Sequence, residues 1–265
     1  MQSKLSPVFY LNLPPYDQFY SVLKECDYGC VVCGAPICYV CTACESKVTG
    51  VDYRLLCQKH LPNNLQGIIE PRSLKNVTLP DNIKRSKSQA EDILHYNDRE
   101  SLSVIIGMVN MIFEKRAESE EQVIFPITID CFPVLLITLI DSHILFDICL
   151  LDEFNNEVLL VRSNMILFCG DGIDISFDKK RLLIKNKDRV LVNIEFSDNS
   201  VRLVEGYFLL SGVKLEINST SISVNNSAIE IPDDRGNENN PLGISIGRNN
   251  MPTALIDIEQ VNRYL

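Results

Sequence analysis

Histidine is scarce in this chain: there are 3 in 265 residues, and none lies between Cys33 and Cys57. Metal-dependent hydrolysis commonly relies on an imidazole as a base or ligand, and that segment cannot supply one. The sequence also lacks a glycine-rich phosphate loop and a Ser-His-Asp set that we would assign to catalysis. These absences argue against several common classes of enzyme.

Long apolar runs are missing as well. The most apolar stretch, CFPVLLITLI at 131–140, is about half a membrane span and is followed by Asp141. Because it is rich in β-branched residues, it is predicted to form a buried strand. Prolines and polar residues interrupt the first 20 residues, so no secretory signal is expected there. We therefore expect a cytoplasmic protein without membrane contact.

The charge is unevenly placed in a composition typical of a globular protein, with 46% apolar and 23% charged residues. Residues 1–100 carry 11 Lys/Arg and 11 Asp/Glu, whereas residues 101–265 carry 14 and 24, which accounts for the whole net charge of −10. Because an acidic surface repels phosphate, contact with nucleic acid is expected only through the N-terminal part.

The cysteines, unlike the histidines, are numerous and clustered: 7 of the 10 lie between residues 26 and 57. In a cytoplasmic protein these are expected to be thiols or metal ligands, not disulfides. The pairs Cys30-x2-Cys33 and Cys57-x2-His60 have the spacing of zinc knuckles, and together they make a Cys3His ligand set. The sequence therefore predicts a structural Zn²⁺ bound by these four residues.

Four further cysteines leave two alternatives open. Cys38, Cys41 and Cys44 are again spaced by two residues, and Cys26 lies just upstream. Either these four bind a second Zn²⁺, with exchange of ligands between the two sets, or they are free thiols around a single ion. Spacing alone does not decide between them.

The chain is predicted to be mostly β, with two domains. Residues 1–95 form a small α+β zinc module with a helix around 15–25. From about residue 100 to 265, short apolar runs alternate with turn signals such as Asn155-Asn156 and Asn186-Lys187, which predicts an all-β roll, sandwich or solenoid. Regularly spaced Ile and Val residues over 217–231 favour solenoid rungs, and 256–265 is expected to end the chain as a short helix.

The segments YGCVVCGAPI and LLCQKHLPNN resemble the treble-clef frame of HNH-type endonucleases. SVIIGMVNMIF and the β-rich segments after it are similar to one bacterial group of that family, so the resemblance covers most of the chain. It implies that Cys30, Cys33, Cys57 and His60 hold a structural zinc. The catalytic histidines of the family correspond to positions near Val40 and Cys41, and a further histidine corresponds to Leu61.

These departures predict that the HNH-like site cannot cleave DNA by the family mechanism, because valine is neither a base nor a ligand and cysteine prefers zinc to magnesium. We expect a zinc-binding, non-catalytic recognition protein that binds a protein partner or itself. Two alternatives are a metal-dependent endonuclease with an altered site and a redox sensor that releases zinc on oxidation.

Overall fold

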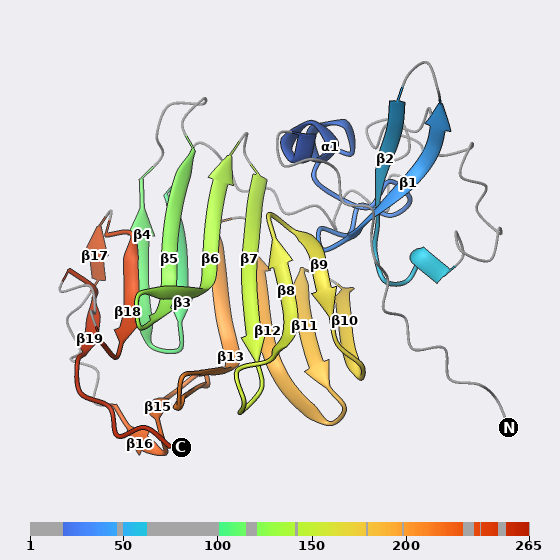
Figure 1. The fold of residues 1–265 in the computed structure, drawn as a ribbon. Helices are drawn as coiled ribbons and strands as arrows, with labels where there is room; N and C mark the ends of the chain where they lie inside the picture. The colour runs from blue at the N-terminus through green and yellow to red at the C-terminus, as the bar shows by residue number, and fades with distance from the viewer. Residues whose placement is uncertain are drawn as a thin grey trace, which may run out of the picture.

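The computed structural model describes residues 18–46, 50–62, 101–114, 121–140, 143–178, 180–197, 199–229, 236–238, 240–248 and 253–264. Over these ranges the chain is mostly β, as predicted, and its two large sheets are open (Figure 1). The connecting segment predicted up to residue 95 lies outside the described residues, so the boundary near residue 100 stays a prediction. Within the described ranges, no helix is both long and apolar enough to cross a membrane.

One large sheet has seven strands in the order β19-β18-β5-β6-β7-β8-β9. Its middle is a meander of antiparallel hairpins, and β18 and β19 add to it in parallel. The predicted buried strand at 131–140 is confirmed as β6. The strands are β5 (Gln122–Ile129), β6 (Phe132–Ile140), β7 (His143–Leu151), β8 (Glu157–Arg162), β9 (Met165–Cys169), β18 (Leu242–Ile246) and β19 (Ile256–Ile258).

The second large sheet has ten strands and follows the order β10 to β16, with β3, β4 and β17 attached beside β13. The strands are β3 (Leu102–Ile106), β4 (Val109–Phe113), β10 (Ile173–Asp178), β11 (Arg181–Asn186), β12 (Arg189–Ser197), β13 (Ser200–Leu210), β14 (Val213–Ile217), β15 (Ile222–Val224), β16 (Ser227–Ala228) and β17 (Gly236–Glu238).

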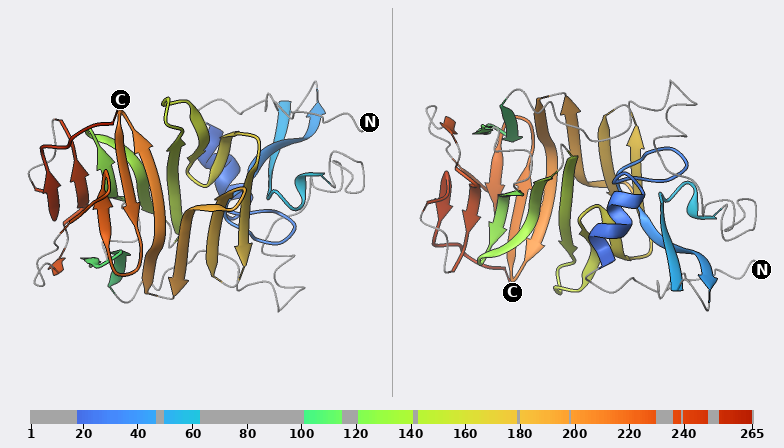
Figure 2. Two further views of the ribbon diagram at one scale, coloured as in Figure 1. Left: turned by 90° about the horizontal axis from the view of Figure 1, so that it is seen from below. Right: turned by 90° about the horizontal axis from the view of Figure 1, so that it is seen from above.

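The two large sheets lie face to face, and their facing side chains form the core (Figures 1 and 2). In β3, β4 and β14 buried residues alternate with half-buried ones, as expected for strands with one face against a partner sheet. Across the interface the ring of Phe146 on β7 meets the ring of Phe196 on β12, with centroids 5.7 Å apart.

Two sequence predictions about the C-terminal half need correction. The solenoid expected over 217–231 does not describe its part at 217–229, because β14, β15 and β16 pair antiparallel in a meander, whereas solenoid rungs stack in parallel. The helix expected at 256–265 is wrong, because Ile256–Ile258 is strand β19 and residues 259–264 are irregular. The Asn186-Lys187 turn is confirmed between β11 and β12, where Lys187 has φ +53°.

The N-terminal module, which the sequence predicts to bind zinc, contributes α1 (Phe19–Glu25), β1 (Tyr39–Ser46) and β2 (Gly50–Leu56). The strands β1 and β2 form a separate antiparallel hairpin. Figures 1 and 2 show this module beside the end of the sandwich that contains β8, β9 and β10. The predicted helix around 15–25 is confirmed over Phe19–Glu25, and Val22 and Leu23 are its buried residues.

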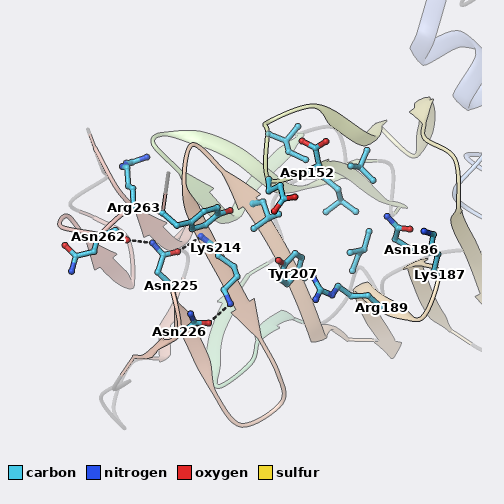
Figure 3. Close-up of a pocket in the computed structure, with 17 residues that line it drawn as sticks. Asp152, Asn186, Lys187, Arg189, Tyr207, Lys214, Asn225, Asn226, Asn262 and Arg263 are labelled. Carbon is cyan, nitrogen blue, oxygen red and sulfur yellow. Dashed lines mark hydrogen bonds between the residues drawn. The ribbon is translucent and has the colours of Figure 1, made fainter.

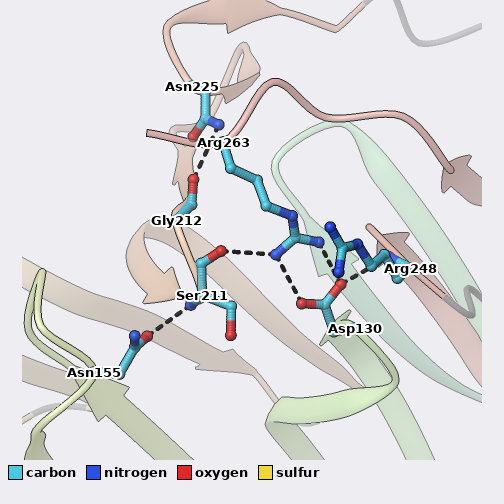
Figure 4. A network of polar contacts seen from close by, with 7 residues as sticks. All are labelled: Asp130, Asn155, Ser211, Gly212, Asn225, Arg248 and Arg263. Carbon is cyan, nitrogen blue, oxygen red and sulfur yellow. Dashed lines mark hydrogen bonds and ion pairs between the residues drawn. The ribbon is translucent and has the colours of Figure 1, made fainter. Parts of the chain in front are cut away.

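The C-terminal segment ties the two sheets together (Figure 4). Arg263 donates to both carboxylate oxygens of Asp130, at 2.9 and 2.6 Å, and to the carbonyl of Ser211 at 2.7 Å. Asp130 lies in the turn between β5 and β6, and Ser211 in the turn between β13 and β14. Gly212 has φ +76°, and a Cβ there would lie 2.4 Å from the Tyr264 carbonyl, so a larger side chain would displace this segment.

We predict that Asp130→Asn destabilises the protein by about 1–2 kcal/mol at pH 7, because a charged, bidentate interaction is lost. Hydrogen bonds from Arg263 lower the pKa of Asp130, so its carboxylate stabilises the fold above its unfolded pKa of about 3.9, and that contribution is lost as the pH falls through the lower folded pKa. The difference in unfolding free energy between wild type and variant should be constant near neutral pH and shrink below about pH 4.

Urea unfolding at several pH values measures this difference. The control is Asp188→Asn, which removes an exposed carboxylate from the β11–β12 turn. An Asp130→Asn penalty that persists unchanged at the lowest pH would contradict the assignment of this effect to the Arg263 ion pair.

Candidate metal centre

A tight turn holds the first pair of candidate ligands, Cys30 and Cys33. Gly34 N donates to the Cys30 carbonyl at 2.7 Å, and Cys30 N donates to the Ala35 carbonyl at 2.8 Å. Gly34 has φ +81°, a conformation that favours glycine. A Cβ on Gly29 would lie 2.6 Å from the Gly34 carbonyl oxygen, so the loop closes on itself only with glycine at this position.

The second pair begins directly after β2. His60 N and Leu61 N both donate to the Cys57 carbonyl, at 2.9 and 3.0 Å, so this turn presents Cys57 and His60 on one side. The register of the hairpin pairs Tyr39 with Leu56, which brings the chain after the first turn beside the start of the second. The hairpin between the two ligand pairs therefore brings Cys30 and Cys33 close to Cys57 and His60, although the pairs are far apart in the sequence.

The four ligand atoms of Cys30, Cys33, Cys57 and His60 all lie within 4.8 Å of one another. The Sγ atoms of Cys33 and Cys57 are 3.7 Å apart, and His60 Nδ1 lies 3.6 Å from Cys30 Sγ and 3.3 Å from Cys57 Sγ. Tetrahedral zinc, with bonds of about 2.3 Å to sulfur and about 2.05 Å to nitrogen, requires S–S edges of about 3.8 Å and S–N edges of about 3.6 Å. The ligand set therefore fits a zinc ion.

The chemistry of the thiols agrees with this geometry. Cys30 and Cys57 are buried, and Cys33 is half-buried. Hydrogen bonds from Cys33, Cys38 and Cys57 lower the pKa of the Cys30 thiol, whereas the hydrogen bonds to Cys30 raise the pKa of Cys33 and of Cys57. A thiolate is the form of cysteine that binds metal, so the cluster favours the ligand state at Cys30 even before an ion neutralises it.

Three of the other four predicted cysteines, Cys26, Cys38 and Cys41, are described in the same module. Cys26 caps the C-terminus of α1, Cys38 precedes β1, and Cys41 lies within β1. The Cys38 thiol donates to the Ala35 carbonyl at 3.0 Å, and burial raises the pKa of Cys26 and of Cys41 to about 12. Without a second ion, these thiols are neutral at physiological pH. The side chain of Cys44 lies outside what the structure describes, so the second zinc stays a prediction.

The positions at which the resemblance to HNH-type proteins would place catalytic histidines are packed into the module. Val40 and Leu61 are both buried, and Cys41 is half-buried opposite Arg54 on β2. Arg54 is itself buried and pairs with Glu25 at 3.2 Å and with Asp52 at 2.5 Å. The pair with Glu25 joins α1 to the hairpin.

Both ligand loops are bonded to the sandwich. Next to the first loop, Cys38 N donates to the Asn164 carbonyl at 2.9 Å, and Ile166 N donates to the Cys38 carbonyl at 2.7 Å, which is a parallel bridge to β9. Within the second loop, the Gln58 side chain accepts from Ile175 N at 2.8 Å and donates to the Ile173 carbonyl at 3.4 Å on β10. The metal centre therefore sits where the module joins the two large sheets.

A third attachment involves a histidine that the sequence analysis did not assign. His143 begins β7, is buried, and stacks on Tyr28 with ring centroids 4.1 Å apart. Its Nε2 lies 3.8 Å from the Asp27 carboxylate. No spacing signal predicts Gln58 or His143, because both contact residues more than a hundred positions away in the chain.

Comparison with known proteins gives no match among family models, curated proteins or solved structures. The assignment of this centre therefore depends on its own ligand geometry.

We predict that Cys57→Ala lowers the bound zinc by about one ion per chain, because three protein ligands do not form a closed structural site. Elemental analysis after dialysis against a mild chelator measures the zinc content. The matched control is Cys149→Ala, which removes a buried thiol from β7 and should leave the zinc content unchanged. Full retention of zinc by Cys57→Ala would refute the ligand assignment.

We also predict that Gln58→Ala destabilises the protein by about 1–3 kcal/mol, because it leaves polar groups of the β10 backbone without their partner. Lys59→Ala is the control, since Lys59 is exposed in the same loop. Urea unfolding of both variants, with zinc content measured alongside, separates the loss of this contact from loss of the metal. Equal stability of the two variants would show that the contact contributes nothing.

Proposed function

We propose that this chain is a zinc-stabilised, non-catalytic recognition protein. The observation that carries the proposal is the position of the ligand cluster: its two loops bond to β9 and to β10. Four protein ligands fill the tetrahedral coordination of zinc, which leaves no open position for water or substrate. Zinc at this centre therefore has a structural role, which is to hold the module against the sandwich.

The proposal includes a treble-clef frame related to that of HNH-type endonucleases. It is supported by the chain order of ligand turn, β-hairpin and second ligand turn, over residues 30–60. Nuclease chemistry needs a base beside a bound cation, yet the positions of Val40 and Leu61 offer only buried apolar groups. The two described histidines are committed as well, His60 to the ligand cluster and His143 to its stack on Tyr28.

We propose further that recognition uses side chains of the β body and does not proceed by pairing of sheet edges. The edge strand β9 is covered by the bridge to Cys38, and β19, at the other edge of that sheet, has only three residues. Short or covered edges are a common means of preventing strands of two molecules from pairing. This favours a separate partner or ligand over self-assembly through strands.

The experiment for this function is a plasmid-nicking assay with added Mg²⁺, Mn²⁺ or Ni²⁺, run beside a zinc determination and a thermal melt. We expect no nicking, about one zinc per chain, and a lower melting temperature after zinc is removed with a strong chelator. Nicking that depends on the added cation and stays with the protein through purification would establish the endonuclease alternative instead.

The zinc determination also decides the second site. A value near two would place another ion on Cys26, Cys38, Cys41 and Cys44, and Cys41→Ala should then lower the content by one. A value near one assigns those cysteines as thiols packed around a single centre.

A further inference from the structure

A cleft of about 780 Å³ lies outside the ligand cluster. Its walls come from the turn after β7, the β11–β12 turn, β13 and the C-terminal segment (Figure 3). One wall adjoins the contact of the second ligand loop, because Asn186 pairs with Ile173, whose carbonyl accepts from Gln58. The volume is that of a site for a small organic ligand.

Cationic side chains outnumber acidic ones in the lining of the cleft. Four cationic side chains line it, from Lys187, Arg189, Lys214 and Arg263, against the two carboxylates of Asp152 and Glu153. Two of the four are paired with carboxylates outside the lining, so the unpaired cations and the lining carboxylates are equal in number. Attraction of an anion is therefore local, at the unpaired cations.

Only two of the four cations are available to a ligand. Arg263 is engaged by Asp130, and Lys214 pairs with Glu216 at 3.0 Å. Lys187 and Arg189 have no carboxylate within ion-pair distance among the described residues. The Arg189 guanidinium lies 4.6 Å from the centre of the Tyr207 ring, and this stacking holds it at the cleft without using its N–H donors.

The opposite end of the cleft presents amides (Figure 3). The Asn225 side chain is engaged by backbone groups, whereas Asn226 accepts from Lys214 and keeps its own NH₂ group available. The side-chain amide of Asn262 has no hydrogen bond within the described part of the chain. An amide offers both donors and acceptors, which is what a row of hydroxyl groups requires.

Between the two ends the surface is apolar and aromatic. Leu191 and Leu209 are buried in the floor, and Tyr264 stands at the wall with 37% of its surface exposed. The pKa of Tyr264 is raised by burial and then by Tyr207 and Glu153, so its phenol is neutral and near those two groups. Such a wall suits the C–H face of a sugar ring beside a hydroxyl donor.

From this arrangement we propose that the cleft binds a saccharide with one negative charge, of the uronic acid class. Its carboxylate lies against Lys187 and Arg189, and its hydroxyl groups face Asn226. A bidentate guanidinium–carboxylate contact is the strong polar interaction that the free Arg189 donors offer. Asp152 and Glu153 disfavour a polyphosphate, and Arg189 already covers a face of Tyr207 that a nucleobase would need for stacking.

Titration calorimetry of the full-length, zinc-loaded protein with sodium glucuronate tests this proposal. We expect saturable binding, and at least about tenfold weaker binding for Arg189→Gln, since a hydrogen bond between charged groups is lost. Arg202→Gln is the matched control: it removes an exposed arginine on β13 that does not line the cleft, and should change the Kd less than about twofold. Asn226→Ala should weaken glucuronate binding without creating binding of acetate.

Three comparison ligands distinguish binding of a uronic acid from binding of a neutral sugar, a simple carboxylate or a sugar phosphate. Glucose lacks the charge, acetate lacks the sugar and glucose 6-phosphate carries a second charge; each is expected to bind at least about tenfold more weakly than glucuronate. No saturable glucuronate binding, equal binding by Arg189→Gln, or a tighter complex with acetate or glucose 6-phosphate would overturn the proposal. If a trimer of uronic acid binds more tightly than the monomer, the natural ligand is the end of a polymer. If the two bind equally, the natural ligand is the free sugar.

Discussion

The architecture depends on covering the unpaired backbone groups at the edges of the two large sheets. The chain leaves the seven-stranded sheet at β9 and enters the ten-stranded sheet at β10, so both edge strands come to one side of the sandwich. Unpaired backbone groups on such edges are templates for aggregation. The module covers both, with the backbone of Cys38 on β9 and the side chain of Gln58 on β10. A metal that joins the two ligand loops fixes both contacts at once.

The opposite end of the sandwich is closed by a different interaction. There the C-terminal segment crosses from one sheet to the other, and Arg263 connects the β5–β6 turn to the β13–β14 turn. The N-terminal module, with its Cys3His cluster, at one side and an ion pair at the other hold together two open sheets. The cleft lies beside this connection between the sheets. Arg263 and Tyr264 contact the β13–β14 turn and also line the wall of the cleft.

Local sequence patterns correctly predicted the features that depend on residues close together in the chain. The Cys-x2-Cys and Cys-x2-His spacings identified the ligand set, and the apolar run at 131–140 identified β6. Runs of short strands do not specify pairing direction, and for this reason the antiparallel meander of β14–β16 was mistaken for solenoid rungs. The segment 256–265 was mistaken for a helix because its apolar spacing does not reveal that β18 offers Ile256–Ile258 a parallel edge. Contacts such as Gln58 with β10 depend on tertiary placement alone.

The expected catalytic positions of a nuclease frame are a further case in which tertiary packing decides. Val40, Cys41 and Leu61 contribute to the packing of the module, so a site at those positions would require the core to open. The cleft instead combines residues of the β11–β12 turn, β13 and the last residues of the chain, each of which reads in sequence as an ordinary turn or strand. A cleft that combines unpaired cations with amide and apolar side chains emerges only when the sandwich brings these turns together. The Cys3His cluster joins the module to both sheets, while the unpaired cations Lys187 and Arg189 lie at the cleft.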